Sequence, residues 1–187
     1  MLYTELTKKA LRVCFDAHKE QTDKAGAPYV FHPFHLAEQM TDEYTTAAAL
    51  LHDTVEDAGL TPEALADMGF PREVTEAVRL LSRPPEMPYM DYIRALRNDP
   101  IARAVKRADL QHNADLSRLD AVTDNDLRRA EKYRLAAALL DEAEPADEEN
   151  RTDSACPIDR KASTDEERPD SSPEDAGERI EGETEQE

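Results

Sequence analysis

The chain has 187 residues, enough for one domain, and a formal net charge of −19 at pH 7. No run approaches the roughly 18 consecutive apolar residues of a membrane span, and no basic patch with interleaved aromatic residues indicates a nucleic-acid-binding surface. The two cysteines, Cys14 and Cys156, lie in separate regions, so no disulfide framework is expected and a cytoplasmic protein without membrane or nucleic-acid partners fits best.

The acidity is concentrated at the end of the chain. Residues 141–187 contain 19 Asp and Glu against 5 Lys and Arg, whereas residues 1–140 contain 23 against 18. The acidic segment has almost no large apolar residues and cannot bury enough surface to offset the entropy lost on ordering. We therefore predict a folded domain over residues 1–141 and a disordered acidic tail over 142–187. That tail is either a solubilising extension or a segment that binds an unknown partner.

The first part of the domain reads as successive helices. Apolar residues recur at helical spacing from Leu6 to Ala17, and charged residues occupy the opposite face. A second helix is expected to begin at Pro33, since proline is favoured in the first turn. An alanine-rich third helix should run from residue 44 to about 57 and end before Gly59.

Proline and threonine mark the starts of the later helices. Thr61 should cap a short helix that Gly69 ends, and helices are expected over residues 71–81, 88–97 and 100–119. A last helix should start after Thr123, with an apolar face that comprises Leu127, Ala130, Leu135, Ala138 and Leu139. Strand alternation is nearly absent from the sequence. The prediction is an all-α, compact helical bundle whose chemistry comes from side chains on facing helices.

Histidine and aspartate residues within these helices form a candidate metal-binding set. Imidazole and carboxylate ligands suit Mn²⁺, Fe²⁺ or Zn²⁺, and four of them leave coordination positions open for water and a phosphate oxygen. An isolated His-Asp pair usually has only a structural role. The pair His52-Asp53 differs, because it follows an apolar run and precedes two further acids. The candidate ligands are His32, His52, Asp53 and Asp109.

Two acidic residues follow the His-Asp pair at helical spacing. Glu56 is four residues after His52, and Asp57 four after Asp53, so each candidate ligand is expected to have a carboxylate one turn beyond it. Such crowding on a buried helix needs a cation, so Glu56 and Asp57 are predicted to position an attacking water and move its proton. The alternative is a solvated acidic helix end ahead of Gly59.

A similar arrangement occurs later in the chain. Lys106, Asp109 and Asn113 are three and four residues apart and should share one helix face. Asp109 could ligate a metal while Asn113 bonds the substrate and Lys106 neutralises phosphate charge. Considered alone, Lys106 could equally be a surface lysine that packs its stem on the helix.

Three ordered segments carry a resemblance to a known family. Residues 18–33, 48–57 and 105–113 resemble the HD-domain hydrolases of the RelA/SpoT type, which remove the 3′-pyrophosphate of the alarmone guanosine tetraphosphate (ppGpp) with a single Mn²⁺. Within that family the chain looks most similar to the small stand-alone bacterial form. The resemblance implies an HD-domain metal-dependent phosphohydrolase that acts on a small nucleotide. It assigns Mn²⁺, or another divalent transition metal, to the candidate ligands, catalysis to Glu56 and Asp57, and substrate contact to Asn113.

One segment departs from the family pattern. The alarmone hydrolases carry a basic residue followed by lysine ahead of a Gly-x-Pro-Tyr segment, and the basic residue stacks on the guanine; this chain has Asp23 and then Lys24. Lys24 is still expected to contact substrate, but an acid offers no cationic face to a purine. Two alternatives therefore stay open beside ppGpp hydrolysis: hydrolysis of a nucleoside monophosphate or another phosphoester, and a nucleotide-binding regulator without turnover.

Overall fold

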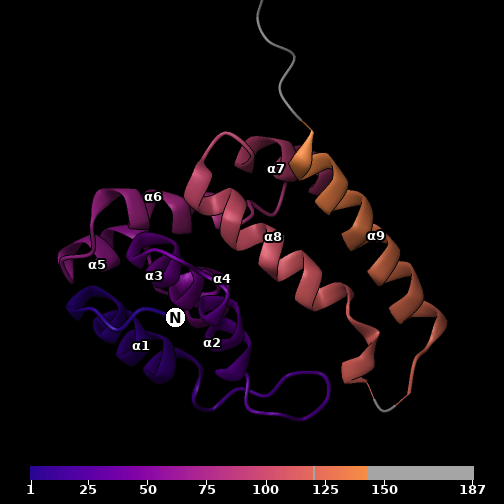
Figure 1. Cartoon of the computed structure of the whole chain (residues 1–187), viewed down its shortest axis with the longest axis horizontal. Coiled ribbons are helices and arrows are strands. Elements are labelled where there is room, and N and C mark those ends of the chain that lie inside the picture. Colours follow the sequence, from indigo (N-terminus) through magenta and orange to yellow (C-terminus); the bar gives the residue numbers. More distant parts are fainter. Residues whose placement is uncertain (120, 143–187) are drawn as a thin grey trace, which may run out of the picture. The chain divides into compact units, whose positions relative to one another are not determined.

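The computed structural model describes residues 1–119 and 121–142, and within these ranges the chain is helical with no strand. A single isolated bridge pairs Thr22 with Pro28 in the loop after the first helix. The all-α prediction is confirmed, while the predicted tail, apart from Glu142, lies outside the described residues. The helices in Figure 1 are α1 Glu5–His18, α2 Phe31–Glu38, α3 Glu43–Leu51, α4 Thr54–Ala58, α5 Pro62–Asp67, α6 Arg72–Leu81, α7 Tyr89–Leu96, α8 Pro100–Ala114 and α9 Asp124–Asp141, with a 3₁₀ turn η1 at Leu116–Arg118.

Helix α3 lies at the centre of the bundle. Every side chain from Thr45 to Leu51 is buried, and the helix packs against α1, α2, α6 and α8. Its three consecutive alanines allow neighbouring helices to approach closely, and this explains why an apolar run rather than an amphipathic stripe encodes it. The residues that end α3 are therefore held at the middle of the domain.

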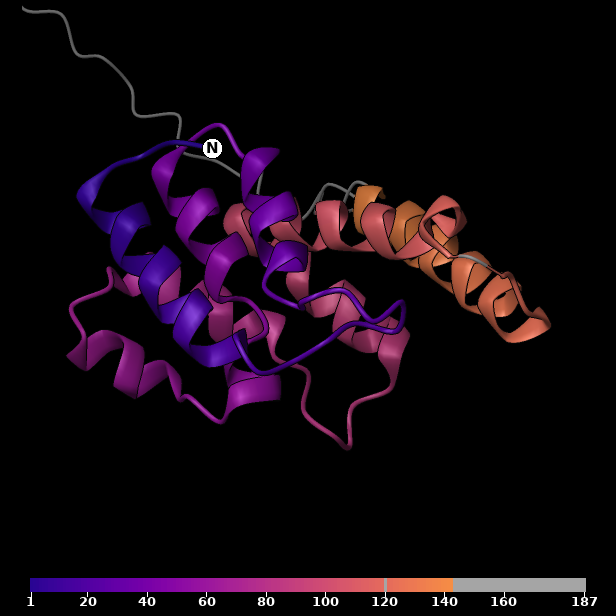
Figure 2. The same cartoon turned by 90° about the horizontal axis from the view of Figure 1, so that it is seen from below.

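Helix α8 connects this centre to the last helix. It packs against α2, α3 and α6 on one side and against α9 on the other. Figure 1 shows α9 running alongside α8, and the turned view in Figure 2 places α9 at the edge of the domain farthest from α1. No helix in the described ranges is both long and apolar enough to cross a membrane.

The predicted continuous helix over residues 44–57 is wrong, because the chain breaks after Leu51 and restarts at Thr54. Two side chains bond to backbone carbonyls there: the Thr54 hydroxyl donates to Leu51 O over 2.7 Å, and Nδ1 of His52 bonds Ala49 O over 2.8 Å. Such local bonds compete with the helical ladder. The break leaves Asp53 between two helices and puts the residues after it on α4.

Other helix boundaries follow the sequence signals with small shifts. Thr61 caps α5 through a bond from Ala64 N, and Thr123 forms a capping box with Asp126 at the start of α9, both as expected. Helix α2 begins at residue 31, two residues before the predicted proline start. The helix predicted over 100–119 ends at residue 114 and is followed by η1.

The predicted apolar face of α9 is largely wrong. Leu127 and Leu135 are 52% and 56% exposed, and Ala138 is also exposed. The residues that α9 buries are Ala130, Ala136 and Leu140. Alanines on several sides of this helix allow more than one packing face, and the position of α8 selects the face that is used.

Candidate metal centre

Four side chains from three parts of the chain converge at the centre of the domain. His32 lies on α2, His52 and Asp53 lie at the break after α3, and Asp109 lies on α8. Ligand atoms of His32, His52 and Asp109 all lie within 4.8 Å of one another. Nε2 of His32 is 3.3 Å from Asp109 Oδ1 and 3.6 Å from Asp53 Oδ2. The structure thus brings together all four residues that the sequence analysis selected as candidate ligands.

The environment of His52 fits a metal ligand. Its Nδ1 donates to a carbonyl oxygen, Ala49 O, which can only accept. Its Nε2 is buried and has no hydrogen-bond partner, and Asp53 Oδ2 lies 2.9 Å from it as an ion-pair partner of the protonated ring. A buried imidazole nitrogen with a carboxylate oxygen 2.9 Å away is a pair of ligand types that divalent cations bind once the nitrogen is deprotonated.

The negative charge of the cluster attracts a proton to His52, and a divalent cation bound there would displace that proton. Burial by itself would lower the pKa of His52, but the charges of Asp53 and Asp109 outweigh it and raise the pKa to about 9. Burial would likewise raise the pKa of Asp53, yet the positive His52 lowers it to about 2. The pKa of Asp109 is also lowered, because the charge of Lys106 more than offsets burial. The carboxylates are therefore ionised at neutral pH, as ligation requires.

The predicted face of α8 is present, and its residues act on one another. Lys106 Nζ donates to Asp109 Oδ2 over 2.8 Å, and Asn113 Nδ2 donates to Asp109 Oδ1 over 2.5 Å. Burial would lower the pKa of Lys106, but Asp109 raises it, so the ammonium group stays charged. Lys106 is 14% exposed at its side chain, so the alternative of a surface lysine is wrong. Both residues orient Asp109, and both line the pocket above it.

The two candidate catalytic acids lie on a different helix from His52. Glu56 and Asp57 are exposed on α4, so the argument that four acidic or ligating groups share one buried helix is wrong. Both nevertheless line the pocket. Glu56 Oε1 accepts from Arg83 N over 2.5 Å, which fixes its carboxylate. Burial and the charge of Asp53 raise the pKa of Asp57, which suits a group that exchanges protons.

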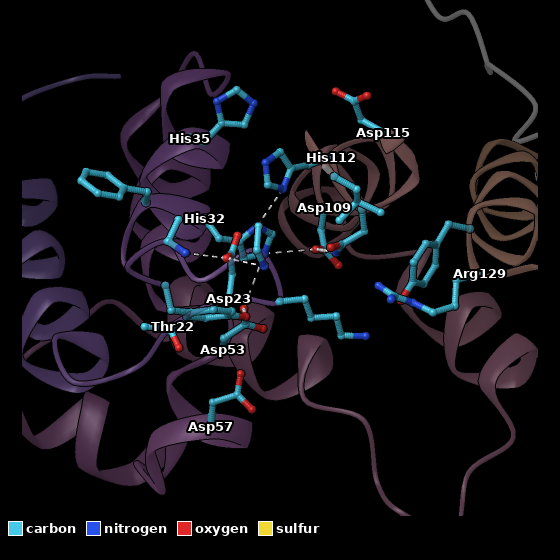
Figure 3. Close-up of a pocket in the computed structure, with 18 of the residues that line it drawn as sticks. Thr22, Asp23, His32, His35, Asp53, Asp57, Asp109, His112, Asp115 and Arg129 are labelled. Atoms are coloured by element: carbon cyan, nitrogen blue, oxygen red, sulfur yellow. Dashed lines mark hydrogen bonds and ion pairs between the residues drawn. The ribbon is translucent and has the colours of Figure 1, made fainter. Parts of the chain in front are cut away.

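A pocket of about 690 Å³ opens from this centre towards α9. Its rim carries Lys24 from the loop after α1, Phe31, which is 61% exposed, and Asp126 and Arg129 from α9. Figure 3 shows Arg129 on the opposite side of the pocket from Asp53 and Asp57. The volume and the mixture of aromatic, cationic and acidic groups suit a small phosphorylated ligand.

Comparisons with known proteins identify the family. No family model matches the chain. The chain is 31% identical over 142 residues to the mouse (Mus musculus) guanosine-3′,5′-bis(diphosphate) 3′-pyrophosphohydrolase MESH1, an alignment that covers 67% of this chain and 79% of that protein. This chain belongs to the guanosine-3′,5′-bis(diphosphate) 3′-pyrophosphohydrolase family. The resemblance predicted from three sequence segments is thereby confirmed.

Two bacterial relatives are much longer than the chain. The bifunctional (p)ppGpp synthase/hydrolase SpoT of Escherichia coli K12 is 35% identical over 123 residues, and a probable GTP pyrophosphokinase of Mycobacterium leprae is 36% identical over 121 residues. The alignments cover 57% and 58% of this chain but only 17% and 15% of those proteins. The chain therefore spans less than a fifth of these relatives.

The structure explains what Asp23 does at the position where the family pattern has a base-stacking residue. Asp23 Oδ1 accepts hydrogen bonds from Ala25 N and Ala27 N, each over 2.9 Å. Together with the backbone bond from Asp23 N to Ala27 O, these bonds close the loop that carries Lys24. In this member of the pyrophosphohydrolase family, Asp23 therefore holds the loop in shape. This explains why a residue that cannot stack on a base stands there.

Sequence reasoning missed three residues of the site: Tyr29, His112 and Arg129. The Tyr29 hydroxyl donates to Asp53 Oδ2 over 2.5 Å, and its ring lies 5.5 Å from that of His32. Tyr29 was visible in the family motif, three residues before His32, as a side chain that could reach the site. Nothing local in the sequence distinguishes Arg129 from the other arginines of α9.

Proposed function

We propose that this chain hydrolyses ppGpp, in which case one water and ppGpp give guanosine diphosphate and pyrophosphate. Family membership and the names of the relatives support the reaction. The observation that carries it is the convergence of His32, His52, Asp53 and Asp109, with Nε2 of His52 buried and without a hydrogen-bond partner. A domain held together by packing alone would leave such a nitrogen at a cost of roughly 1–3 kcal/mol.

We propose that these four residues hold one divalent cation, for which Mn²⁺ fits the mixed imidazole and carboxylate set. When bound, the cation polarises the phosphate ester and lowers the pKa of water. Tyr29 and Asn113 restrain the carboxylates of Asp53 and Asp109 by hydrogen bonds. Lys106 balances the charge of the ligands and faces the pocket, where it can also attract phosphate oxygens.

In the proposed reaction Glu56 and Asp57 handle the proton. Glu56 is fixed by Arg83 N, and Asp57 has a raised pKa, so the two carboxylates have different environments at the same wall of the pocket. Asp57 is the better proton acceptor of the two, because a raised pKa makes its carboxylate more basic. Glu56 orients the attacking water from a fixed position. Lys24 and Arg129 attract the remaining phosphates at the rim.

Hydrolysis of another phosphoester is the second candidate, and one observation favours it. The carboxylate of Asp23 is bonded to its own loop, so the guanine-stacking contact of the family pattern is missing from this position. A nucleoside monophosphate would use the same floor of the pocket and fewer of the rim cations.

A substrate panel separates the two candidates. The full chain is incubated with Mn²⁺ and with ppGpp, nucleoside monophosphates and other phosphoesters, and pyrophosphate and phosphate are measured separately. Pyrophosphate release from ppGpp that stops on chelation supports the proposal. Phosphate release from a monophosphate, without turnover of ppGpp, would favour the second candidate. No turnover of any compound by metal-loaded protein would leave the regulator hypothesis.

A further inference from the structure

A further histidine, His112, bonds one of the four candidate ligands, His32. Its Nδ1 lies 2.9 Å from Nδ1 of His32. We infer that His112 is a positioning residue: it accepts the Nδ1 proton of His32 and so keeps Nε2 of His32 bare for a metal. The inference rests on the proposed metal centre but concerns a residue outside the ligand set.

The two ring nitrogens of His32 face different partners. Nε2 faces Asp109 Oδ1 at 3.3 Å and Asp53 Oδ2 at 3.6 Å, whereas Nδ1 faces His112. In Figure 3 His112 lies above His32, on the side away from Asp53. A neutral imidazole carries one proton, so the partner of Nδ1 determines whether Nε2 has a lone pair for a cation.

His52 and His32 differ in how this choice is made. Nδ1 of His52 meets Ala49 O, which can only accept, so its tautomer is fixed by the backbone. Nδ1 of His32 meets another imidazole nitrogen, which can donate or accept. Just one arrangement leaves Nε2 of His32 bare: Nδ1 of His32 donates, and His112 accepts at Nδ1 and carries its own proton on Nε2. His112 thus acts as the acceptor that usually fixes a metal-binding histidine.

Helix α8 carries His112 to this position. His112 stands three residues after Asp109 on α8, so one helix presents a ligand and the group that orients another ligand. Its ring lies 4.9 Å from the ring of His32 and 4.7 Å from that of His35. The ring of His35 contacts the ring of His112, and the residue that meets Nδ1 of His32 is His112. His35 therefore provides a matched control for the loss of an imidazole beside the cluster.

The test measures metal affinity in the full chain by competition with a chromophoric chelator, using Mn²⁺ and Zn²⁺. His112→Ala should weaken binding by about 10- to 100-fold, the usual effect of removing a partner of a metal-binding histidine. His112→Asn places an amide oxygen near the position of Nδ1 and should restore most of the affinity. His35→Ala should bind within about threefold of the parent. The thermal midpoint of each metal-free variant reports whether the variant folds.

A second measurement needs no variant and stands even if His112→Ala fails to fold. In the Zn²⁺-loaded parent, ¹⁵N ring resonances should show a protonated Nδ1 on His32 and a bare Nδ1 on His112. Equal affinity of His112→Ala and parent, or a protonated Nδ1 on His112, would overturn the inference while leaving the metal centre in place. A parent that binds neither metal would overturn the proposed metal centre and the inference together.

Discussion

The pocket has a floor and a mouth that are built differently. The floor, which comprises His32, His52, Asp53 and Asp109, comes from the packed helices, and its exposed side-chain fractions range from 3% to 17%. The mouth, which comprises Lys24, Phe31, Asp126 and Arg129, comes from a loop, the start of α2 and the edge helix α9. Phe31 is 61% exposed there, and Arg129 is 28% exposed at its side chain. Charges in the floor need buried partners, whereas water screens Lys24 and Arg129 at the mouth; Asp126, 17% exposed at its side chain, is intermediate.

The largest effect should follow the loss of a floor charge. Asp109→Asn removes an anionic ligand and leaves Lys106 buried without its anion. Metal affinity should fall by more than about 100-fold and turnover below detection, and the free energy of unfolding should fall by on the order of 3 kcal/mol. Metal analysis, turnover and chemical denaturation measure the three quantities.

Asp115→Asn is the matched control for the floor, since Asp115 lines the exposed part of the same pocket. Asparagine can still accept the bond that Asp115 Oδ1 receives from Ser117 N. Affinity for metal should stay within about threefold of the parent, as is usual for an exposed charge. If Asp109→Asn held metal as tightly as this control, the floor would not be a metal centre.

A smaller effect is expected at the wall between floor and mouth. Glu56→Gln keeps an oxygen that can accept from Arg83 N and removes only the carboxylate charge. Turnover should fall by roughly 10²–10⁴ while metal remains bound, because the carboxylate that orients the attacking water is lost. Single-turnover rates on metal-loaded protein measure this loss. Glu86→Gln, an exposed glutamate away from the pocket, should behave as the parent, and a normal rate for Glu56→Gln would refute the assignment.

A substitution at the mouth should change substrate binding and leave the chemical step unaffected. Arg129 pairs with Asp126 at 3.3 Å and lines the pocket, so Arg129→Ala should raise KM about 5- to 10-fold and leave kcat and metal affinity unchanged. Steady-state kinetics with the substrate found in the panel provide the measurement. Arg128→Ala removes the exposed neighbour and is the control. A fall in kcat for Arg129→Ala alone would mean that the mouth takes part in the chemical step.

The smallest effect is expected for Cys14, a buried core residue whose thiol should react very slowly in the native protein. Burial, with a contribution from the charge of Asp53, raises the pKa of Cys14 to about 12. At pH 8 the thiolate fraction is on the order of 10⁻⁴, so Cys14 should stay unmodified by iodoacetamide in native protein and react in denaturant. Peptide mapping by mass spectrometry identifies the residue. Rapid labelling of Cys14 in the native protein would show that the packed helices open. It would contradict the contrast between a buried floor and an exposed mouth.

The sequence by itself determined what depends on neighbours three or four residues away. Thr61 and Thr123 cap their helices because each side chain meets an amide in the next turn. Lys106, Asp109 and Asn113 share a face because the helical period places them there. The candidate ligands were selected on other grounds, from their residue types and from three ordered segments that resemble a known family.

Tertiary structure alone decided contacts between residues far apart in the chain. The Nδ1 atoms of His32 and His112 meet across 80 positions, and Tyr29 reaches Asp53 across 24, only after α2, α3 and α8 have packed. The exposure of Leu127 and Leu135 was likewise decided by which side of α9 the neighbouring helix covers. Helical spacing specifies which residues share a face, but the free energy of burial depends on the surface that meets that face.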